Sequence, residues 1–284
     1  MKSVDQMITL NKKQAEFYDR IQEAEEGAGW GYEKNEDANW MTRAWAKLRY
    51  QQQRAVATTG IWDREREMHL DWFSEKAGGS FLEIGCFSGS AYTFDLISAA
   101  GDYTGIELSS VACTSLRQKV EAQGCSEKAA VVCGDFLEYE PGRKFDFVYA
   151  HGVLHHFENP GPLFSKIRSM VADTGFLVFV EPVAINPVFR VLRNLYRPFQ
   201  SDAAWEWPFQ ENTVDELFKR FEIAEGFGYG RFSAPLTIVC GIPLVGSLVL
   251  PAYKWIVRRE VSTGASQSSY WHNSTVVAKC LPKT

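Results

Sequence analysis

The stretch Phe81-Leu-Glu-Ile-Gly-Cys-Phe-Ser-Gly-Ser90 decides the fold of this chain. Its first four residues are apolar except for Glu83 and predict a short buried strand, and Gly85 and Gly89 flank a tight loop. Apolar residues at helical spacing follow Ser90. A strand, a glycine turn and a helix start bring backbone N–H groups and the positive end of a helix dipole together, which is typical of a site for a nucleotide-like ligand.

Four more apolar runs follow this stretch, and each ends in a turn or a polar residue. They are 103–106 before Glu107, 129–133 before Gly134-Asp135-Phe136, 145–150 before a histidine-rich segment, and 175–180 before Glu181. Helical patterns lie between them, at 90–100, 109–123 and 159–171. Such alternation predicts a parallel, doubly wound α/β sheet, with the ligand at the carboxyl ends of the strands.

Acidic residues stand at the ends of the second and third predicted strands. Glu107 ends the second predicted strand, about 20 residues after the glycine loop, where a carboxylate can accept hydrogen bonds from a ribose diol. Asp135 follows the third strand in the same way. The alternatives are a solvated strand-end carboxylate for Glu107 and a helix cap or turn residue for Asp135.

Four motifs in this order resemble the class I S-adenosylmethionine-dependent methyltransferases, in the small-molecule branch that includes the ubiquinone and menaquinone type. They are Glu83-Ile-Gly85-Cys-Phe-Ser-Gly89, Gly105-Ile-Glu107-Leu-Ser-Ser110, Gly134-Asp135-Phe136 and the segment from Phe145 to Phe157. The resemblance covers about residues 75–225 and a last strand near the C-terminus. It implies a mostly parallel, seven-stranded, Rossmann-like sheet with an antiparallel last strand.

The resemblance also implies S-adenosylmethionine as the cofactor. Glu83 and the Gly85 backbone would hold its methionine end, Glu107 the ribose, and Asp135 with Phe136 the adenine. The full set implied for the cofactor is Glu83, Gly85, Cys86, Phe87, Gly89, Glu107, Leu108, Asp135, Phe136, Ala150 and His151. Phe87 departs from the family pattern, because it stands where the middle glycine of the loop usually lies.

Three of the five histidines follow the fourth predicted strand: His151, His155 and His156. Such positions face the substrate cleft, and an imidazole can take a proton from a hydroxyl or an amine near neutral pH. His155 and His151 are therefore the candidate catalytic bases, and a purely structural histidine pair is the alternative. We predict no metal site, because no acidic ligand set completes one.

Further candidates for substrate contact are aromatic or acidic. Glu181 ends the fifth strand and would face the cleft. Tyr32, Trp205 and Trp207 would line the acceptor pocket or close over a cation. The alternative for each of the three aromatic residues is plain packing.

The domain organisation follows from where the strand and helix alternation starts and stops. Residues 1–77 predict a helical N-terminal cap, or a packed extension without ligand contact. Residues 78–284 predict the cofactor-binding domain, with insertions at about 182–210 and 229–273. The second insertion separates two strands that the family joins by a short turn, and a loop of that length is usually functional.

The segment Pro235–Tyr253 in this insertion has no charged residue. Its length is close to that of a membrane span, but Pro235, Pro243 and Pro251 would break a single helix. The alternatives are a hydrophobic hairpin at 232–257 that lines an apolar pocket or rests on a membrane surface, and an ordinary buried cap.

The composition is that of a globular protein, with 284 residues, 45% hydrophobic residues and a net charge of −5. The negative charge argues against a nucleic-acid partner, which calls for a basic face. Six cysteines occur without a Cys-x-x-Cys pair, and the first residues lack the apolar core of a signal peptide. We therefore expect a reduced, cytoplasmic protein, peripheral to the membrane if the 232–257 segment rests there.

The sequence thus predicts a methyltransferase for a small-molecule or lipid-like acceptor, with a preference for a hydroxyl because a histidine base suits one. An NAD-dependent oxidoreductase is the first alternative, since a glycine loop followed by an acidic strand end also fits a nicotinamide cofactor. A cofactor-binding protein without catalytic activity is the second, because the fold does not fix the function.

Overall fold

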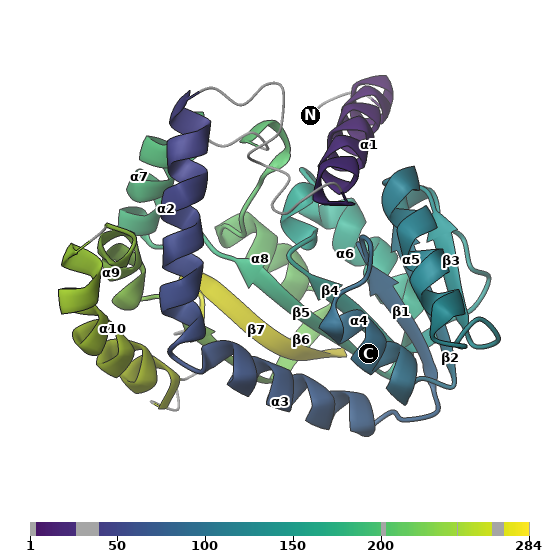
Figure 1. Ribbon diagram of the computed structural model, residues 1–284. Coiled ribbons are helices and arrows are strands. Elements are labelled where there is room, and N and C mark those ends of the chain that lie inside the picture. Colours follow the sequence, from purple (N-terminus) through teal and green to yellow (C-terminus); the bar gives the residue numbers. More distant parts are fainter. Residues whose placement is uncertain (1–3, 27–39, 200–202, 243, 263–269, 284) are drawn as a thin grey trace.

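The computed structural model describes residues 4–26, 40–199, 203–242, 244–262 and 270–283. One sheet has the strand order β3-β2-β1-β4-β5-β7-β6 (Figure 1). Its strands are β1 (Ser80–Ile84), β2 (Asp102–Glu107), β3 (Ala129–Cys133), β4 (Phe145–His151), β5 (Val171–Pro182), β6 (Phe221–Tyr229) and β7 (Thr275–Pro282). The first five pair in parallel, and β7 runs antiparallel to both β5 and β6. The predicted fold class is confirmed.

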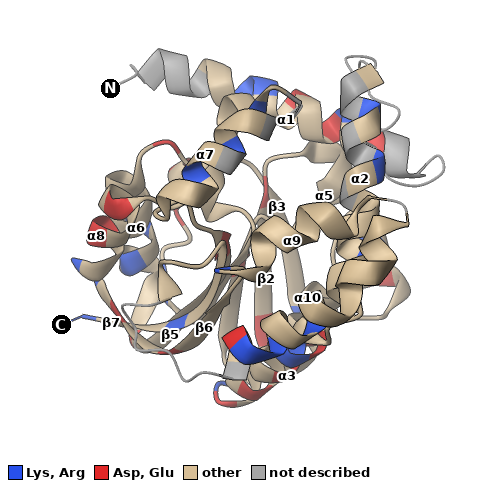
Figure 2. Ribbon diagram, turned by 90° about the vertical axis from the view of Figure 1, so that its left-hand side faces the viewer, with Lys and Arg blue, Asp and Glu red and all other residues tan. Residues whose placement is uncertain are grey.

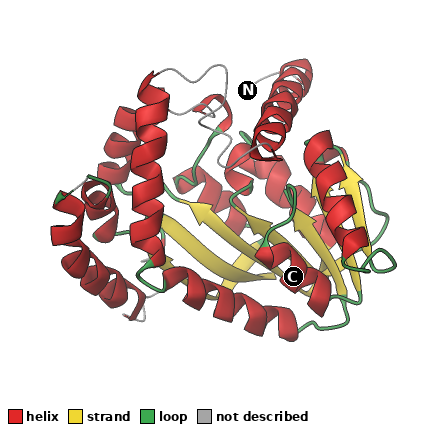
Figure 3. Cartoon of the chain, in the orientation of Figure 1, coloured by secondary structure: helices red, strands yellow, loops and turns green. Residues whose placement is uncertain are grey.

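Helices lie on both faces of this sheet (Figure 3). They are α1 (Val4–Glu26), α2 (Trp40–Ala57), α3 (Ile61–Ser74), α4 (Ala91–Ala99), α5 (Ser110–Ala122), α6 (Pro160–Met170), α7 (Pro187–Tyr196), α8 (Glu211–Phe218), α9 (Ser233–Cys240) and α10 (Val245–Ser262). The cores assign α6 and α8 to one face of the sheet, and α3, α4 and α5 to the other.

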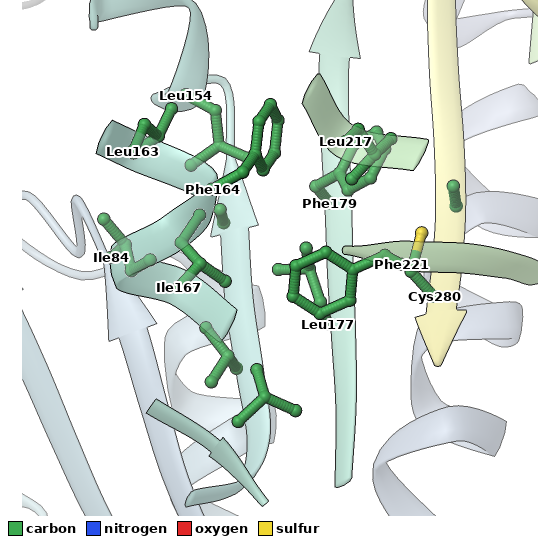
Figure 4. Close-up of a cluster of buried hydrophobic side chains, with 14 of the residues drawn as sticks. Ile84, Leu154, Leu163, Phe164, Ile167, Leu177, Phe179, Leu217, Phe221 and Cys280 are labelled. Atoms are coloured by element: carbon green, nitrogen blue, oxygen red, sulfur yellow. The ribbon is translucent and has the colours of Figure 1, made fainter. Parts of the chain in front are cut away.

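The side chains of β5 show how the two cores form. Leu177 and Phe179 belong to the cluster with α6 and α8, and Val178 and Val180 to the cluster on the opposite face. This alternation follows from the two-residue period of a strand. Figure 4 shows the first cluster, in which Phe179 lies beside Leu217 of α8. Because both faces are covered, β5 is apolar along most of its length.

The N-terminal segment forms helices, as its spacing predicts. The helix α1 lies beside α5, above the carboxyl ends of the central strands, and α2 packs along α9 (Figure 1). The Gly-rich turn at 27–32 lies outside the described residues.

The 229–273 insertion contains two helices, α9 and α10, which pack against each other. Pro251 lies within α10, and Leu244 has a φ of 67°, in the left-handed region, just before α10 begins. The structure therefore places two helices, not one, in the uncharged stretch. Among the described residues, no helix is both long and apolar enough to cross a membrane.

Candidate functional site

A first cavity of about 310 Å³ lies at the carboxyl ends of β1, β2 and β4 and beside the turn after β3. This is where a doubly wound sheet binds its ligand. Its lining comprises Asn11, Gln14, Tyr18, Ile21, Ile84, Gly85, Phe87, Ile106, Glu107, Leu108, Gly134, Asp135, Phe136, His151, Gly152, Val153, His156 and Phe157.

The loop after β1 approaches this cavity through unusual backbone angles. Gly85 has a φ of 71°, and a Cβ there would lie 2.5 Å from Cγ2 of Val153. Phe87 also has a positive φ, 45°, which is rare for a residue with a side chain. Gly85 therefore satisfies two constraints, on conformation and on space, that no larger residue meets.

Glu107 holds this loop to the tip of β2. Its Oε2 accepts a hydrogen bond from the Phe87 N–H at 3.0 Å, and its Oε1 accepts one from the Ser109 N–H at 2.8 Å. Burial raises the pKa of the Glu107 carboxyl, against the opposing effect of these N–H donors. The carboxylate lines the cavity and has further lone pairs, so it can accept hydrogen bonds from a diol.

Asp135 caps a turn and also lines the first cavity. Its Oδ1 accepts from the Leu137 N–H at 2.9 Å and caps the 3₁₀ turn Phe136–Glu138. Its Oδ2 accepts from the side-chain amide of Asn11. The residue also lines the cavity, so the capping contact does not remove it from the ligand.

The helix α1 closes the cavity from above. Asn11, Gln14, Tyr18 and Ile21 line it, and none of them was predicted as a site residue. Asp19 fixes the helix, because its Oδ1 accepts from the Ser109 hydroxyl at 2.5 Å and the Val111 N–H at 3.2 Å, at the N-terminus of α5. The spacing of α1 marks a helix, but no sequence signal indicates where it docks.

The predicted cofactor residues divide into two groups. Those that line the cavity are Gly85, Phe87, Glu107, Leu108, Asp135, Phe136 and His151. Glu83, Cys86, Gly89 and Ala150 do not line it. Cys86 and Ala150 are buried in the cores, and a Cβ on Gly89 would point at Leu116. These four positions support the loop from behind.

Glu83 lies behind the loop because successive strand residues face opposite sides of a sheet. Its carboxylate accepts hydrogen bonds from the Tyr103 hydroxyl at 2.6 Å and the Thr93 hydroxyl at 3.1 Å. Burial raises the pKa of Glu83 to about 7, although these two donors oppose the shift. The role in holding the methionine end stays a prediction for Glu83, and its observed contacts are internal.

His151 is paired with a carboxylate from α3. Its Nε2 lies 3.1 Å from Oε1 of Glu65, which also accepts a hydrogen bond from the Tyr92 hydroxyl at 3.1 Å. Burial alone would lower the pKa of His151, but the hydrogen bond and charge of Glu65 outweigh it and raise that pKa. The Glu65 contact therefore favours the protonated form of His151, beside the first cavity.

A second cavity of about 670 Å³ adjoins the first. The two share Tyr18, Gly152 and His156 in their linings. The rest of the second lining comprises Gln52, Gln53, Val56, Trp62, His155, Pro182, Val183, Ala184, Phe189, Arg193, Glu206, Tyr229, Gly230, Ser233, Ala234, Thr237, Ile238, Tyr253, Ser274 and Thr275. Its walls therefore include α2, α7, α9 and α10, so the 229–273 insertion does line a pocket.

His155 lines the second cavity, next to the shared residue His156, and is held by a buried carboxylate. Its Nδ1 lies 2.7 Å from Oε2 of Glu181, which is fully buried. Glu181 also accepts hydrogen bonds from the backbone N–H groups of Val153, Leu154 and His155. An imidazole that donates from Nδ1 to a carboxylate keeps the lone pair on Nε2, and His155 is a lining residue of the second cavity.

His156 has a different environment from its neighbour. Its Nδ1 lies 2.8 Å from the Trp205 carbonyl oxygen, and its Nε2 lies 3.1 Å from the Tyr18 hydroxyl. Burial and the adjacent His155 lower the pKa of His156 to about 3. His156 is therefore neutral and connects α1 to the segment after β5.

The predicted substrate residues lie elsewhere than expected. Glu181, Trp205 and Trp207 line neither cavity. Glu181 contacts His155 instead, Trp205 packs on Phe17, and the Trp207 N–H donates to the His155 carbonyl oxygen at 2.6 Å. Tyr32 lies outside the described residues.

The polar groups that do face the second cavity include a buried ion pair that was not predicted. Arg193 of α7 donates to Glu206, which is 8% exposed. Arg193 has the helical spacing of an ordinary surface residue, and Glu206 lies between two tryptophans. No pattern in the sequence connects them.

Comparison with known proteins agrees with this geometry. Residues 82–177 match the sequence family described as "Methyltransferase domain". A curated relative, (S)-coclaurine N-methyltransferase of Papaver somniferum, is 31% identical over 123 residues, which are 40% of this chain and 33% of that protein. This chain therefore matches only about a third of the length of that relative.

Two solved structures are similar in fold. The N-methyltransferase NodS from Bradyrhizobium japonicum WM9, in complex with S-adenosyl-L-homocysteine, has a TM-score of 0.50 and 17% identity, over 78% of this chain and 87% of that one. Geranyl diphosphate C-methyltransferase from Streptomyces coelicolor A3(2) has a TM-score of 0.55 and 12% identity, over 82% and 84%. At such low sequence identities, the similarity to these two structures establishes the fold of this chain.

The fold is therefore the Rossmann-like fold of the class I methyltransferases, and residues 82–177 resemble a methyltransferase domain in sequence. S-adenosylmethionine is the cofactor of that class, and the first cavity fits it. Glu107 offers acceptors for a ribose diol, Asp135 and Phe136 flank a place for a base, and the glycine loop lies at the end of β1. These matches do not separate the ubiquinone and menaquinone branch, which stays a prediction.

We expect the substitution Glu107→Gln to weaken cofactor binding. A hydrogen bond to a charged group contributes about 1.5–3 kcal/mol, so the Kd for S-adenosylhomocysteine should rise about 10- to 100-fold. Isothermal titration calorimetry measures this change. Glu138→Gln, at an exposed carboxylate near the cavity, is the matched control and should leave the Kd unaltered. An unaltered Kd in the Glu107 variant would remove this residue from the ligand.

The raised pKa of Glu83 predicts a pH-dependent stability. Because its folded-state pKa is about 7 against an ordinary value of 4.5, the folded protein binds the extra proton between these two values. The free energy of unfolding should therefore fall, relative to that of Glu83→Gln, by up to roughly 3 kcal/mol as the pH rises through this window. Urea unfolding at about pH 5 and about pH 8 tests it, with the exposed Glu127→Gln as control. Parallel pH profiles in the wild type and the Glu83 variant would contradict the prediction.

Proposed function

We propose that this protein is a methyltransferase that uses S-adenosylmethionine in the first cavity and methylates a small-molecule acceptor in the second. The observation that carries the proposal is the junction of the two cavities at Tyr18, Gly152 and His156. Methyl transfer needs the donor and acceptor atoms in line and close together, and two adjoining pockets meet that need. His155 lines the second cavity next to the shared His156, and its Nδ1 contact with Glu181 leaves Nε2 for a proton.

The residues of the chain have separate roles in this proposal. S-adenosylmethionine, when bound, supplies an activated methyl group on a sulfonium. Glu107 orients its ribose, and α1 excludes water from above. His155 Nε2 takes the proton of the acceptor, and Glu181 holds the imidazole in the tautomer that leaves this nitrogen basic.

We propose an amine nitrogen as the acceptor atom. The preference for a hydroxyl in the sequence analysis has no support from the comparisons. The curated relative and NodS are both named N-methyltransferases. An amine that reaches the cavity protonated must lose its proton before its lone pair can react, and His155 supplies a base for that step.

The lining of the second cavity indicates that the acceptor molecule is partly apolar. Val56, Trp62, Phe189 and Ile238 face it, together with the Arg193–Glu206 pair. A molecule with an apolar body and one polar end fits such a lining. A lipid-like acceptor, and contact of the 232–257 segment with a membrane, remain part of the proposal.

The two other functions are less well supported. A nicotinamide-dependent oxidoreductase does not agree with the family match over residues 82–177. A cofactor-binding protein without catalytic activity would not need a histidine oriented by a buried carboxylate next to a second cavity. Tight binding of NADH without binding of S-adenosylhomocysteine would favour the first, and binding without any methyl transfer would favour the second.

The primary test follows label from methyl-tritiated S-adenosylmethionine into an extract of the source cells. We expect a labelled product that partitions into organic solvent when the pH exceeds the amine pKa of about 10, and into water in acid. A methylated hydroxyl would partition without regard to pH and would contradict the amine proposal. Absence of transfer to any extract would contradict the enzyme proposal, and heat-inactivated protein is the control.

The substitution His155→Asn should lower kcat much more than it raises the Kd for S-adenosylhomocysteine. A general base contributes about 10²- to 10⁴-fold to a rate, whereas cofactor affinity should change less than about threefold, since this residue faces the second cavity. Single-turnover kinetics and calorimetry measure the two effects separately. His272→Asn, at an exposed histidine, is the control. An unaltered kcat would remove His155 from the role of base.

A further inference from the structure

The outer side of α10 is apolar and exposed, although its inner side is buried. Val245, Leu248 and Trp255 of α10 are 43%, 82% and 61% exposed and recur at helical spacing, and Leu244, just before the helix, is 87% exposed. Tyr253, on the inner side, is 3% exposed. Exposed apolar side chains gathered on one helix face mark a site of interaction, whereas scattered ones do not.

The helix α7 has the same character. Val188, Val191 and Leu195 follow one face of it and are each more than half exposed, whereas Phe189 on the other side is buried. In Figure 1, α7, α9 and α10 lie on one side of the molecule, and in Figure 2 this side faces the viewer. We name the exposed residues of α7 and α10, together with Arg231 and Phe232 just before α9, the docking face.

Positive charge gathers at the α9 and α10 part of the docking face. Residues 229–262 contain four basic residues and one acidic residue, in a chain whose net charge is −5. The basic residues are Arg231, Lys254, Arg258 and Arg259. The acidic residue, Glu260, accepts hydrogen bonds from the backbone at the start of α9. Residues 229–262 therefore carry a net charge of +3, from four cations and one anion.

Two of these cations stack on exposed aromatic rings. The Arg259 guanidinium lies 5.1 Å from the centre of the Trp255 ring, and that of Arg231 lies 5.2 Å from the Phe232 ring. Phe232 is 64% exposed. Aromatic rings beside arginine are the groups that proteins place at the boundary between lipid headgroups and acyl chains.

The inner sides of the same helices line the second cavity. Phe189 comes from α7, Thr237 and Ile238 from α9, and Tyr253 from α10. The docking face is therefore on the outer side of this helical layer, and the second cavity is on its inner side. A molecule that leaves a surface bound by the docking face has a short path to His155.

We propose that the docking face binds the surface of an anionic lipid bilayer, and that the acceptor reaches the second cavity from that surface. The apolar side chains enter the headgroup boundary, and the arginines and lysine contact the phosphates. A second copy of this chain fits the face less well, because a two-fold contact would bring its basic clusters together. The origin of the acceptor rests on the proposed function, whereas the lipid contact deepens that proposal and can be tested without methyl transfer.

The experiment is co-sedimentation of the full chain with vesicles of phosphatidylcholine, alone or with phosphatidylglycerol. We expect binding to the anionic vesicles, weaker binding to the neutral ones, and a loss as the salt concentration rises. Removing two charges in Arg258→Gln/Arg259→Gln should lower the partition coefficient about 30-fold, at about 1 kcal/mol for each charge. Leu248→Ser/Trp255→Ser should lower it at least about tenfold, because two exposed apolar side chains no longer enter the boundary.

The matched controls change the same residue types elsewhere. Leu70→Ser/Trp40→Ser removes two exposed apolar residues from α3 and α2, and Arg117→Gln/Lys144→Gln removes two cations outside α7, α9 and α10. Both controls should bind vesicles like the wild type. Equal losses in variants and controls, or no binding to anionic vesicles, would overturn the proposal. So would light scattering that shows a dimer dispersed by Leu248→Ser/Trp255→Ser.

Vesicle binding and methyl transfer are measured separately, so the two proposals can fail separately. Vesicle binding without methyl transfer to any extract would leave the docking face intact and remove the enzyme function. Methyl transfer to a water-soluble acceptor, by a protein that does not bind vesicles, would support the enzyme function and overturn the lipid contact of the docking face.

Discussion

A single buried carboxylate, that of Glu181, holds together the part of the structure where the two cavities meet. It accepts hydrogen bonds from three consecutive backbone N–H groups after β4 and lies 2.7 Å from Nδ1 of His155. A buried carboxylate is tolerated only with such a complete set of donors. These hydrogen bonds also fix the turn that lies between the first cavity and the second cavity. Removing Glu181 would leave four donors without this partner and would release His155 at the same time.

The histidines after β4 show how environment divides one residue type into different roles. His151 pairs with Glu65, which raises its pKa, whereas burial lowers the pKa of His156 to about 3. A sulfonium in the first cavity would therefore meet a neutral imidazole at His156 and, at His151, an imidazole that is paired with the Glu65 side chain. This arrangement avoids placing an uncompensated positive charge beside a cationic cofactor.

Much of the first cavity could be predicted from the sequence, because its residues lie at strand ends that the chain order brings together. Gly85, Glu107 and Asp135 each follow a short apolar run, and parallel strands place such positions at one edge of the sheet. Glu83 was expected at the same site, but strand alternation turns its side chain away, towards Tyr103 and Thr93. The order of the strands in the sequence predicts which residues lie at this edge of the sheet. The alternation of side chains along each strand determines which of them face the ligand.

The second cavity could not be predicted in this way, because its walls come from segments without a fixed place in the fold. The spacing of α1 and α2 marks them as helices, but docking depends on single contacts, such as that of Asp19 with the start of α5. In the sequence the insertion contains one uncharged apolar stretch. Because the structure divides it into α9 and α10, some of its residues line the second cavity and others face solvent. An apolar residue such as Leu248 and one such as Ile238 are equivalent in the sequence. In the structure Leu248 is exposed and Ile238 lines the second cavity. These positions agree with a helical layer that makes contacts on both of its sides.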